Sequence, residues 1–153
     1  MKKKGFTILE ILVVLAVLAI LIGIAMPRIK GMQEQANITK AQMELKTIQL
    51  AIESYYINKN NTYPDTDTKI TNTLLGETDI PQILSEILLD PFSTAGEEYK
   101  YKKSDDGNYY VIYSVGLDGS EGTTNINDGG TCDLKDDGGL DNIWVTNGSD
   151  CVL

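Results

Sequence analysis

An almost unbroken apolar run near the N-terminus, residues 6–26, constrains the fold of this chain more than any other feature. An α-helix rises about 1.5 Å per residue, so the run is long enough to cross a hydrocarbon core roughly 30 Å thick. Lys2, Lys3 and Lys4 precede it, and the positive-inside rule places them on the cytoplasmic side. The sequence therefore predicts a transmembrane helix with the rest of the chain outside the cytoplasm.

Glu10 is the single charged residue within this run. A charge at membrane depth costs several kcal/mol unless something compensates it. A secretory signal cleaved after Ala25 fits the small residues Gly23 and Ala25. However, the apolar segment of a secretory signal is shorter than the run of this chain. A plain membrane anchor explains the length and leaves Glu10 without a purpose. The remaining interpretation is a prepilin leader.

The stretch KKKGFTILE resembles the class III signal of type IV pilins and type II secretion pseudopilins. Gly5 matches the residue before the cut and Phe6 the new N-terminus, while Thr7 and Glu10 stand in register with the motif. Pro27 falls at the family's usual proline position. The resemblance implies cleavage after Gly5 by a prepilin peptidase, and methylation of the Phe6 amine.

The same resemblance implies an assembly role for Glu10, together with Thr7 and Pro27. In the family, the glutamate pairs with the Phe6 amine of a neighbouring subunit. Two opposite charges attract strongly in a low dielectric, and each is costly alone, so the pair fixes the register of assembly. The alternative is a helix-end carboxylate that reaches the lipid headgroups.

Apolar residues continue after Pro27 at spacings of three and four, which predicts an amphipathic helix over 27–58. The stripe comprises Ile38, Ala41, Leu45, Ile48, Ile52 and Tyr55. We expect this stripe to seat a small sheet, and the breaker-rich stretch NKNNTYP to end the helix near Asn58. Pro27 cannot donate to the carbonyl of Gly23, which predicts a kink, or a milder bend, at Gly23–Pro27.

Residues 59–153 are predicted to form a C-terminal globular domain. We expect a surface loop over 62–78, a short helix over 80–89 that Asp90-Pro91 stops, and a β-hairpin around an Asp-Gly turn. The candidates for the faces of that hairpin are Tyr99, Tyr101, Tyr110 and Ile112. A further strand is predicted at 142–145. The fold class is therefore α+β and resembles a type IV pilin: a long N-terminal helix packed on a small antiparallel sheet.

The composition argues against two classes of function. With 22 acidic and 13 basic residues the net charge is −9, so nucleic acid is not expected as a partner. The chain has no histidine, which removes the commonest general base, and no nucleophile–base set is visible. We therefore expect a protein that is not an enzyme.

Residues 116–151 form an acidic, glycine-rich loop region that would bury little surface on its own. Cys132 and Cys151 lie within it. Outside the cytosol the simplest expectation is a disulfide, which would close a ring of about 20 residues and stabilise the domain by roughly 3 kcal/mol. A cytosolic thiol pair and a soft-metal site are the alternatives.

The segments LDPF, YKYK and YSVGLDGSEG…DNIW look like the C-terminal domain of the major pseudopilin (G-type) of type II secretion, which binds calcium. Carried over by position, Asp118 matches one carboxylate ligand. Asp141 matches the second, with Asp137 as a rival, and the carbonyls of Leu117 and Ile143 are further candidates. The alternative is a solvated acidic loop.

Two departures from this pattern stand out. Phe92 occupies a position where tryptophan is usual. Major pseudopilins generally lack a C-terminal disulfide. A disulfide that encloses the last segment of this chain would instead resemble the D-region of true type IV pilins. Such a disulfide would be able to replace calcium in stabilising the loops.

The resemblance implies a structural subunit of a helical filament, most like the major pseudopilin of a type II secretion system. The implied partners are further copies of the chain, the prepilin peptidase, the inner-membrane assembly platform and minor pilins or pseudopilins. The implied location is the bacterial inner membrane, with a single pass and the C-terminal domain outside. The alternatives are a major or minor pilin of a true pilus, used in adhesion, motility or DNA uptake, and a secreted calcium-binding module.

Overall fold

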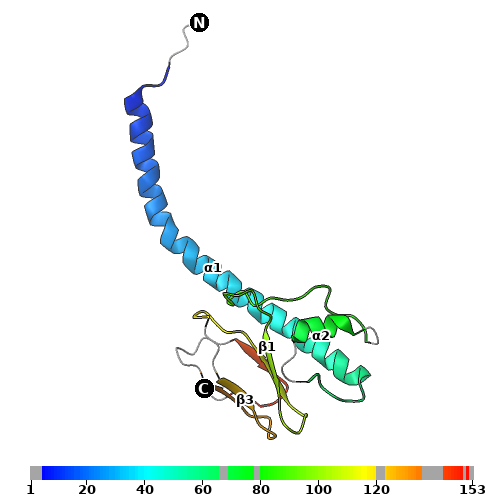
Figure 1. The fold of residues 1–153 in the computed structure, drawn as a ribbon. Helices are drawn as coiled ribbons and strands as arrows, with labels where there is room; N and C mark the ends of the chain where they lie inside the picture. Colours follow the sequence, from blue (N-terminus) through cyan, green and yellow to red (C-terminus); the bar gives the residue numbers. More distant parts are fainter. Residues whose placement is uncertain are drawn as a thin grey trace. The chain divides into compact units, whose positions relative to one another are not determined.

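The structure is a computed structural model that describes residues 5–65, 69–77, 80–119, 123–135, 143–149 and 151. Its helices are α1, Ile8–Asn58, and α2, Ile70–Gly76 (Figure 1). The strands are β1 Lys100–Lys103, β2 Tyr110–Tyr113, β3 Thr123–Ile126, β4 Cys132–Lys135 and β5 Trp144–Thr146. The chain divides into two compact units, Met1–Ala36 and Asn37–Leu153.

The Met1–Ala36 unit contains the first part of α1. By length and composition α1 is able to cross a membrane, and its apolar window is fully exposed in the isolated chain. The helix remains an α-helix across 23–27, so the kink expected there stays a prediction.

The Asn37–Leu153 unit is built on the second part of α1. Ala41, Leu45, Ile48 and Ile52 are fully buried, while Ile38 and Tyr55 at the ends of the stripe are half-buried. The predicted apolar stripe is therefore confirmed. α1 ends at Asn58 as predicted, and Asn60 and Asn61 follow in the left-handed region with φ of 53° and 55°. Asparagine tolerates this conformation better than most residues, which favours the sharp exit from the helix.

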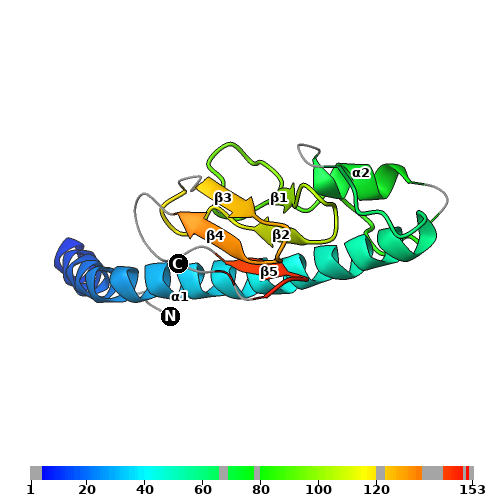
Figure 2. The same ribbon diagram turned by 90° about the horizontal axis from the view of Figure 1, so that it is seen from below.

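A three-stranded antiparallel sheet in the order β1-β2-β5 lies along this part of α1 (Figure 2). β1 and β2 form the predicted hairpin, with Tyr101 opposite Ile112. The strand predicted at 142–145 is present as β5, which begins two residues later and ends one residue later than predicted. The four side chains expected on the hairpin faces are all buried: Tyr99, Tyr101, Tyr110 and Ile112. Alternation along the strands brings these side chains to the core beside α1.

A second, two-stranded sheet pairs β3 with β4, with Ile126 opposite Cys132. It lies inside the stretch that the sequence predicts as a loop region. The turn between the strands is closed by the Asn127 amide, which donates to the carbonyl of Thr131 at 3.0 Å, and Gly130 adopts a φ of 74°. Ile126 and Cys132 pack with Val111 and Tyr113 of β2 in a small second core.

Two local predictions are wrong. α2 lies within the predicted surface loop over 62–78, and its own residues Ile70 and Leu74 are buried. The predicted helix over 80–89 is absent, because that segment runs as bends and extended chain. Its end is held extended instead: Leu89 forms an isolated β-bridge with Glu98. Tertiary contacts have overridden local propensity in both places.

Candidate assembly segment and C-terminal loop region

Thr7 is the N-cap of α1. Its hydroxyl accepts a hydrogen bond of 3.2 Å from the Glu10 amide, and its carbonyl accepts one of 3.3 Å from the Ile11 amide. A side-chain oxygen that satisfies an otherwise unpaired amide of the first turn is the usual N-cap arrangement, and Thr-x-x-Glu is the capping-box sequence. The sequence predicts Thr7 only as an assembly residue, although this spacing is itself a capping signal.

Glu10 is exposed in the first turn of α1. The N-terminal end of a helix carries partial positive charge, which offsets part of the cost of a carboxylate there. Gly5 and Phe6 precede the helix in non-helical chain, and 79% of the Phe6 surface is exposed. The peptide bond that the motif predicts to be cut is therefore accessible. The side chain of Pro27 lies outside the described residues.

The first part of α1 exposes large apolar side chains on every face, from 47% exposure at Leu18 to 88% at Ile8. A patch of this size on a soluble monomer marks an interaction surface or a membrane segment. Such a surface has to be covered either by lipid or by other apolar helices.

A buried carboxylate, Asp90, organises the loop region at the C-terminal end of β2. It is 3% exposed and accepts 2.8 Å hydrogen bonds from the Ser114 hydroxyl and from the Val115 amide, and one of 3.0 Å from the Phe92 amide. Three donors to one carboxylate satisfy a buried charge without a cation. Asp90 thereby ties the LDPF segment to the start of the Leu117–Asp118 turn.

The residues predicted to bind calcium are only partly described. Leu117 and Asp118 are exposed in a turn closed by the Gly119 amide, which donates to the Gly116 carbonyl at 3.1 Å. The Ile143 carbonyl accepts a 2.8 Å hydrogen bond from the amide of Ser114, two residues before this turn. Asp137 and Asp141 lie outside the described residues.

Within the described part of the chain, no group of three or more acidic, cysteine or histidine side chains is arranged to hold a metal ion. One carboxylate and two carbonyls fall short of the 6–8 oxygens that calcium takes. The described donors therefore do not make a calcium site by themselves.

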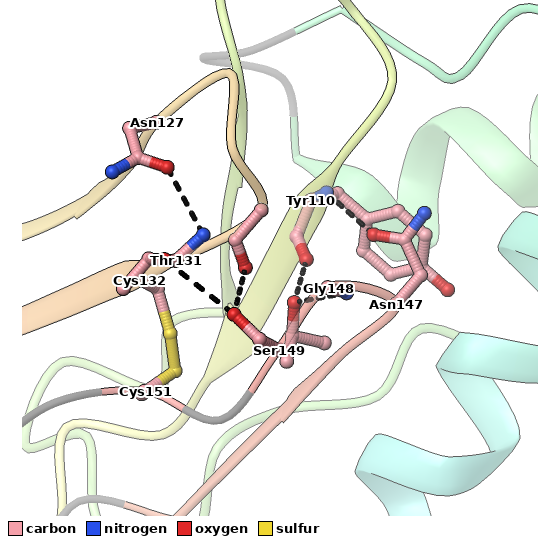
Figure 3. Close-up of a disulfide and its surroundings, with 10 residues drawn as sticks. Tyr110, Asn127, Thr131, Cys132, Asn147, Gly148, Ser149 and Cys151 are labelled. Carbon is pink, nitrogen blue, oxygen red and sulfur yellow. Dashed lines mark hydrogen bonds between the residues drawn. A yellow bond between two sulfur atoms is a disulfide. The ribbon is translucent and has the colours of Figure 1, made fainter.

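Cys132 and Cys151 form a disulfide, as predicted from their spacing and expected location (Figure 3). It joins β4 to Cys151 in the C-terminal segment, whose described residues 146–149 and 151 we call the C-terminal strap. Ser149 reinforces the joint, because its amide and hydroxyl donate to the Gly130 carbonyl at 2.9 and 3.1 Å. Gly148 packs so tightly on Gly130 that a Cβ there would collide with the Gly130 carbonyl.

Asn147 locks the strap to β2. Its amide oxygen accepts a 2.8 Å hydrogen bond from the Tyr110 amide, and its amide nitrogen donates to the Asn108 carbonyl and to the Tyr63 phenol, both at 3.1 Å. The strap is therefore held by a covalent bond at one end and by a network of hydrogen bonds along its length.

Carboxylates on α1 anchor the tyrosines of the sheet. The Tyr110 phenol donates to Glu53 at 2.6 Å, and the Tyr99 phenol donates to Glu44 at 2.6 Å. Burial, and then the hydrogen bonds to these glutamates, raise the pKa of both phenols well above the usual range. These glutamates are not predictable from the sequence, because nothing in a polar helix face tells which carboxylate will meet a tyrosine of the sheet.

The fold and the N-terminal segment together define a class, that of pilin-like proteins with a capped apolar helix joined to a small α+β domain. Residues 1–26 match the prokaryotic N-terminal methylation motif. Residues 28–129 match the type II secretion system protein G family. The chain belongs to the type II secretion system protein G family.

Curated relatives agree. The chain is 30% identical to the type II secretion system core protein G of Pseudomonas aeruginosa over 129 residues, 79% of this chain and 88% of the relative. It is 30% identical to that of Vibrio cholerae, over 79% and 85% of the two chains. For Aeromonas hydrophila the identity is 29%, over 88% and 96%. The family match ends at residue 129, so the disulfide and the C-terminal strap lie beyond it.

Proposed function

We propose that this chain is the repeating structural subunit, the major pseudopilin, of a type II secretion filament. The single observation that carries the proposal is the combination, in one chain, of a methylation motif at 1–26 and a protein G domain match over 28–129. The proposed role is assembly rather than catalysis. The family match favours a secretion pseudopilin over a true pilus and over a secreted module.

In this proposal the subunit waits in the bacterial inner membrane, with its N-terminus in the cytoplasm and its C-terminal domain outside. A prepilin peptidase cuts after Gly5 and the new Phe6 amine is methylated. Glu10 then meets the Phe6 amine of an adjacent copy. The exposed position of all three residues before and within the first turn of α1 supports this sequence of steps.

The apolar segment also sets the energetics of assembly. Once the helices leave the bilayer, packing them together removes apolar surface from water, at roughly 25 cal/mol per Å². Within the bilayer that driving force is absent, because lipid tails are as apolar as the helix. An inner-membrane platform driven by ATP is therefore proposed to extract the subunits, with minor pseudopilins as further partners.

The intact mass of the mature protein tests the proposed processing. A mass that corresponds to residues 6–153 plus one methyl group is expected. Cleavage after Ala25 would support a secreted module and would overturn the proposal.

The structure makes the role of Glu10 separable from helix capping, because Thr7 caps through the backbone amide of Glu10 rather than through its side chain. Glu10→Gln keeps the shape and the cap while removing the charge. We expect Glu10→Gln to insert into the membrane normally and to form few filaments, as judged by electron microscopy. Normal filaments from Glu10→Gln would contradict the role.

Calcium is a further proposal for the loop region. Asp118 would supply one carboxylate and the aspartates of 136–142 the remainder. Its support is the 2.8 Å hydrogen bond between the backbone groups of Ser114 and Ile143, because Ser114 lies two residues before the turn that contains Leu117 and Asp118.

A further inference from the structure

β1 is an edge strand of the three-stranded sheet, because the order β1-β2-β5 places a described strand on only one of its sides. The 2.9 Å hydrogen bond from the Ser104 amide to the Tyr109 carbonyl fixes which residues of β1 face β2. In an antiparallel ladder, hydrogen-bonded and non-hydrogen-bonded pairs alternate. Tyr101 therefore points its amide and carbonyl away from β2, and no described residue forms a hydrogen bond with either group.

The segment that precedes β1 pairs with the beginning of this edge and then leaves it. Leu89 forms an isolated β-bridge with Glu98, and the Asp90 amide donates to the Glu97 carbonyl at 2.9 Å. The pairing does not extend along β1, since residues 81–88 contain bends and no strand. An edge with open backbone groups is a template on which another extended chain is able to pair.

A hollow with a volume of about 600 Å³ lies beside β1, and we call it the β1 slot. Its volume is within the range of pockets that bind small ligands. The apolar part of the β1 slot contains Ile87 and Leu89, which are each 46% exposed, and the buried Tyr113. A strand edge beside a partly apolar hollow is suited to an extended segment, because the backbone supplies affinity and the hollow accepts a side chain.

The charged part of the β1 slot has an excess of basic groups. Its charged residues are Lys69, Lys100, Lys102, Glu97 and Glu98. Both carboxylates have partners: Glu97 accepts a 2.8 Å bond from Lys100, and Glu98 accepts three bonds of 2.6–3.1 Å from the first turn of α2. Lys69 and Lys102 form no ion pair within the described part of the chain. The β1 slot therefore offers two ammonium groups to an anionic partner, in a chain whose net charge is −9.

We propose that the β1 slot binds an extended, acidic segment of another protein, which adds a strand to the edge of the sheet beside β1. The backbone of that segment pairs with the amide and carbonyl of Tyr101. A carboxylate of the segment meets Lys102 or Lys69, and an apolar side chain packs on Ile87 and Leu89. In this mode of recognition the main-chain hydrogen bonds give affinity and the side-chain pockets give specificity.

The acidic region of a second copy of this chain fits the β1 slot less well. Four of its carboxylates are followed directly by glycine: Asp118, Glu121, Asp128 and Asp137. Glycine weakens a strand and has no side chain to pack on the apolar part of the slot. The partner that fits is a protein in which carboxylates alternate with large apolar residues, since such a segment favours an extended strand.

The first experiment measures peptide binding by the full chain in phosphatidylcholine nanodiscs, in which lipid covers the apolar N-terminal segment. The probe is a fluorescent peptide of alternating glutamate and valine, and its binding is followed by fluorescence anisotropy. We expect it to bind, and to bind more weakly as the salt concentration rises. Peptides of alternating lysine and valine, or of alternating glutamate and glycine, should bind about tenfold more weakly or worse.

Charge variants locate the site of binding. Lys102→Glu replaces an attractive charge by a repulsive one and should weaken binding of the glutamate–valine peptide about tenfold or more, whereas Lys102→Arg should retain it. Lys69→Glu should act in the same direction, and it lies outside β1, so its effect does not depend on the stability of that strand. Lys46→Glu is the matched control, because Lys46 also forms no ion pair with a described residue and lies outside the β1 slot.

The second experiment tests strand addition. Consecutive amides of an extended peptide point to opposite edges, so N-methyl groups on alternate residues block hydrogen bonding along one edge only. Two forms of the probe are compared, one methylated at every glutamate amide and the other at every valine amide. We expect one form to lose binding and the other to keep it. Binding of the unmethylated probe should also slow hydrogen exchange at the Tyr101 amide.

Each result decides the inference. Absence of binding to the unchanged protein, or equal weakening by Lys102→Glu and Lys46→Glu, would overturn the acidic partner at this site. Equal binding of the two methylated peptides would overturn strand addition. Slow exchange at Tyr101 without peptide that becomes faster on dilution would place a second copy in the β1 slot and overturn the assignment to another protein. No measurement requires a filament, so failure of the inference leaves the proposed function intact.

Discussion

The phenol of Tyr110 on β2 donates a 2.6 Å hydrogen bond to the carboxylate of Glu53 on α1, two residues 57 positions apart in the chain. Tyr110 is fully buried and Glu53 half-buried. The same carboxylate accepts longer bonds of 3.4 and 3.5 Å from the Tyr63 phenol. Glu53 thus connects the long helix, the loop after it and the central strand of the sheet.

Removing this carboxylate should destabilise the domain. Glu53→Ala leaves the buried Tyr110 hydroxyl without its acceptor, which costs about 1–3 kcal/mol. We expect that loss in the free energy of unfolding from denaturant titration. Glu86→Ala, at an exposed acid, is the control and should change it by about 0.5 kcal/mol or less. Equal losses in both variants would show that the hydrogen bond contributes nothing.

The buried tyrosines predict instability at alkaline pH. Burial raises the pKa of Tyr99, Tyr101 and Tyr110 in the folded protein, whereas in the unfolded chain each ionises near pH 10. Their contribution is therefore complete below about pH 10 and is lost as pH rises towards the folded values. Tyrosinate absorbance at 295 nm should increase in two steps, the second coinciding with loss of the circular dichroism signal. Ionisation of all eight tyrosines near pH 10 in a folded protein would contradict this.

Gly148 is predicted to tolerate no side chain. A Cβ at this position would collide with the Gly130 carbonyl, which is backbone and has no freedom to rotate away. Gly148→Ala should lower the free energy of unfolding by about 1–3 kcal/mol, because the C-terminal strap must shift. Gly76→Ala is the matched control, since a Cβ there meets nothing within 4 Å. A melting temperature of Gly148→Ala equal to that of the control would refute the close packing.

The disulfide should stabilise the domain mainly by restricting its unfolded state. Cys132 and Cys151 are separated by 19 positions, and replacing both by serine should cost about 3 kcal/mol. Denaturant titration with and without reductant measures this loss. Reductant should weaken the unchanged protein to the level of the double variant and leave the double variant unaffected. A reductant effect on the double variant would mean that the loss has another cause.

Calcium binding is testable by thermal melting of the oxidised protein with added calcium or with a chelator. If the loop region binds the ion, calcium raises the melting temperature by binding only the folded state. Asp118→Asn should remove the shift, and Asp105→Asn, at another exposed acid, should keep it. The absence of any shift in the unchanged protein would remove the calcium proposal.

Local patterns of the sequence were enough to predict α1, its buried stripe and the β1–β2 hairpin. In each case the informative residues are neighbours in the chain: the apolar spacing around Leu45 and Ile48, and the Asp-Gly turn between the two strands. Helix and hairpin periodicities are set by backbone geometry over a few residues, so they can be read directly. The N-terminal motif is equally local, and the methylation-motif match agrees with it.

Other features were decided by contacts between distant parts of the chain. α2 exists where a loop was predicted because Glu98 accepts hydrogen bonds from the Thr71 amide and hydroxyl, at 2.9 and 2.6 Å. The predicted helix over 80–89 is lost because the bridge from Leu89 to Glu98 holds its end extended. Each of these outcomes depends on a partner more than eight positions away.

The sequence by itself determined the class of this protein, its long helix and the pairing of its two cysteines. Only the tertiary structure decided that Glu53 would anchor the sheet and Asp90 the loop region, that β3 and β4 would pair inside the acidic region, and that one side of α1 would remain uncovered. The physical reason is that a polar side chain is stabilised in the interior only by specific partners, and those partners are brought together by folding rather than by proximity in the chain.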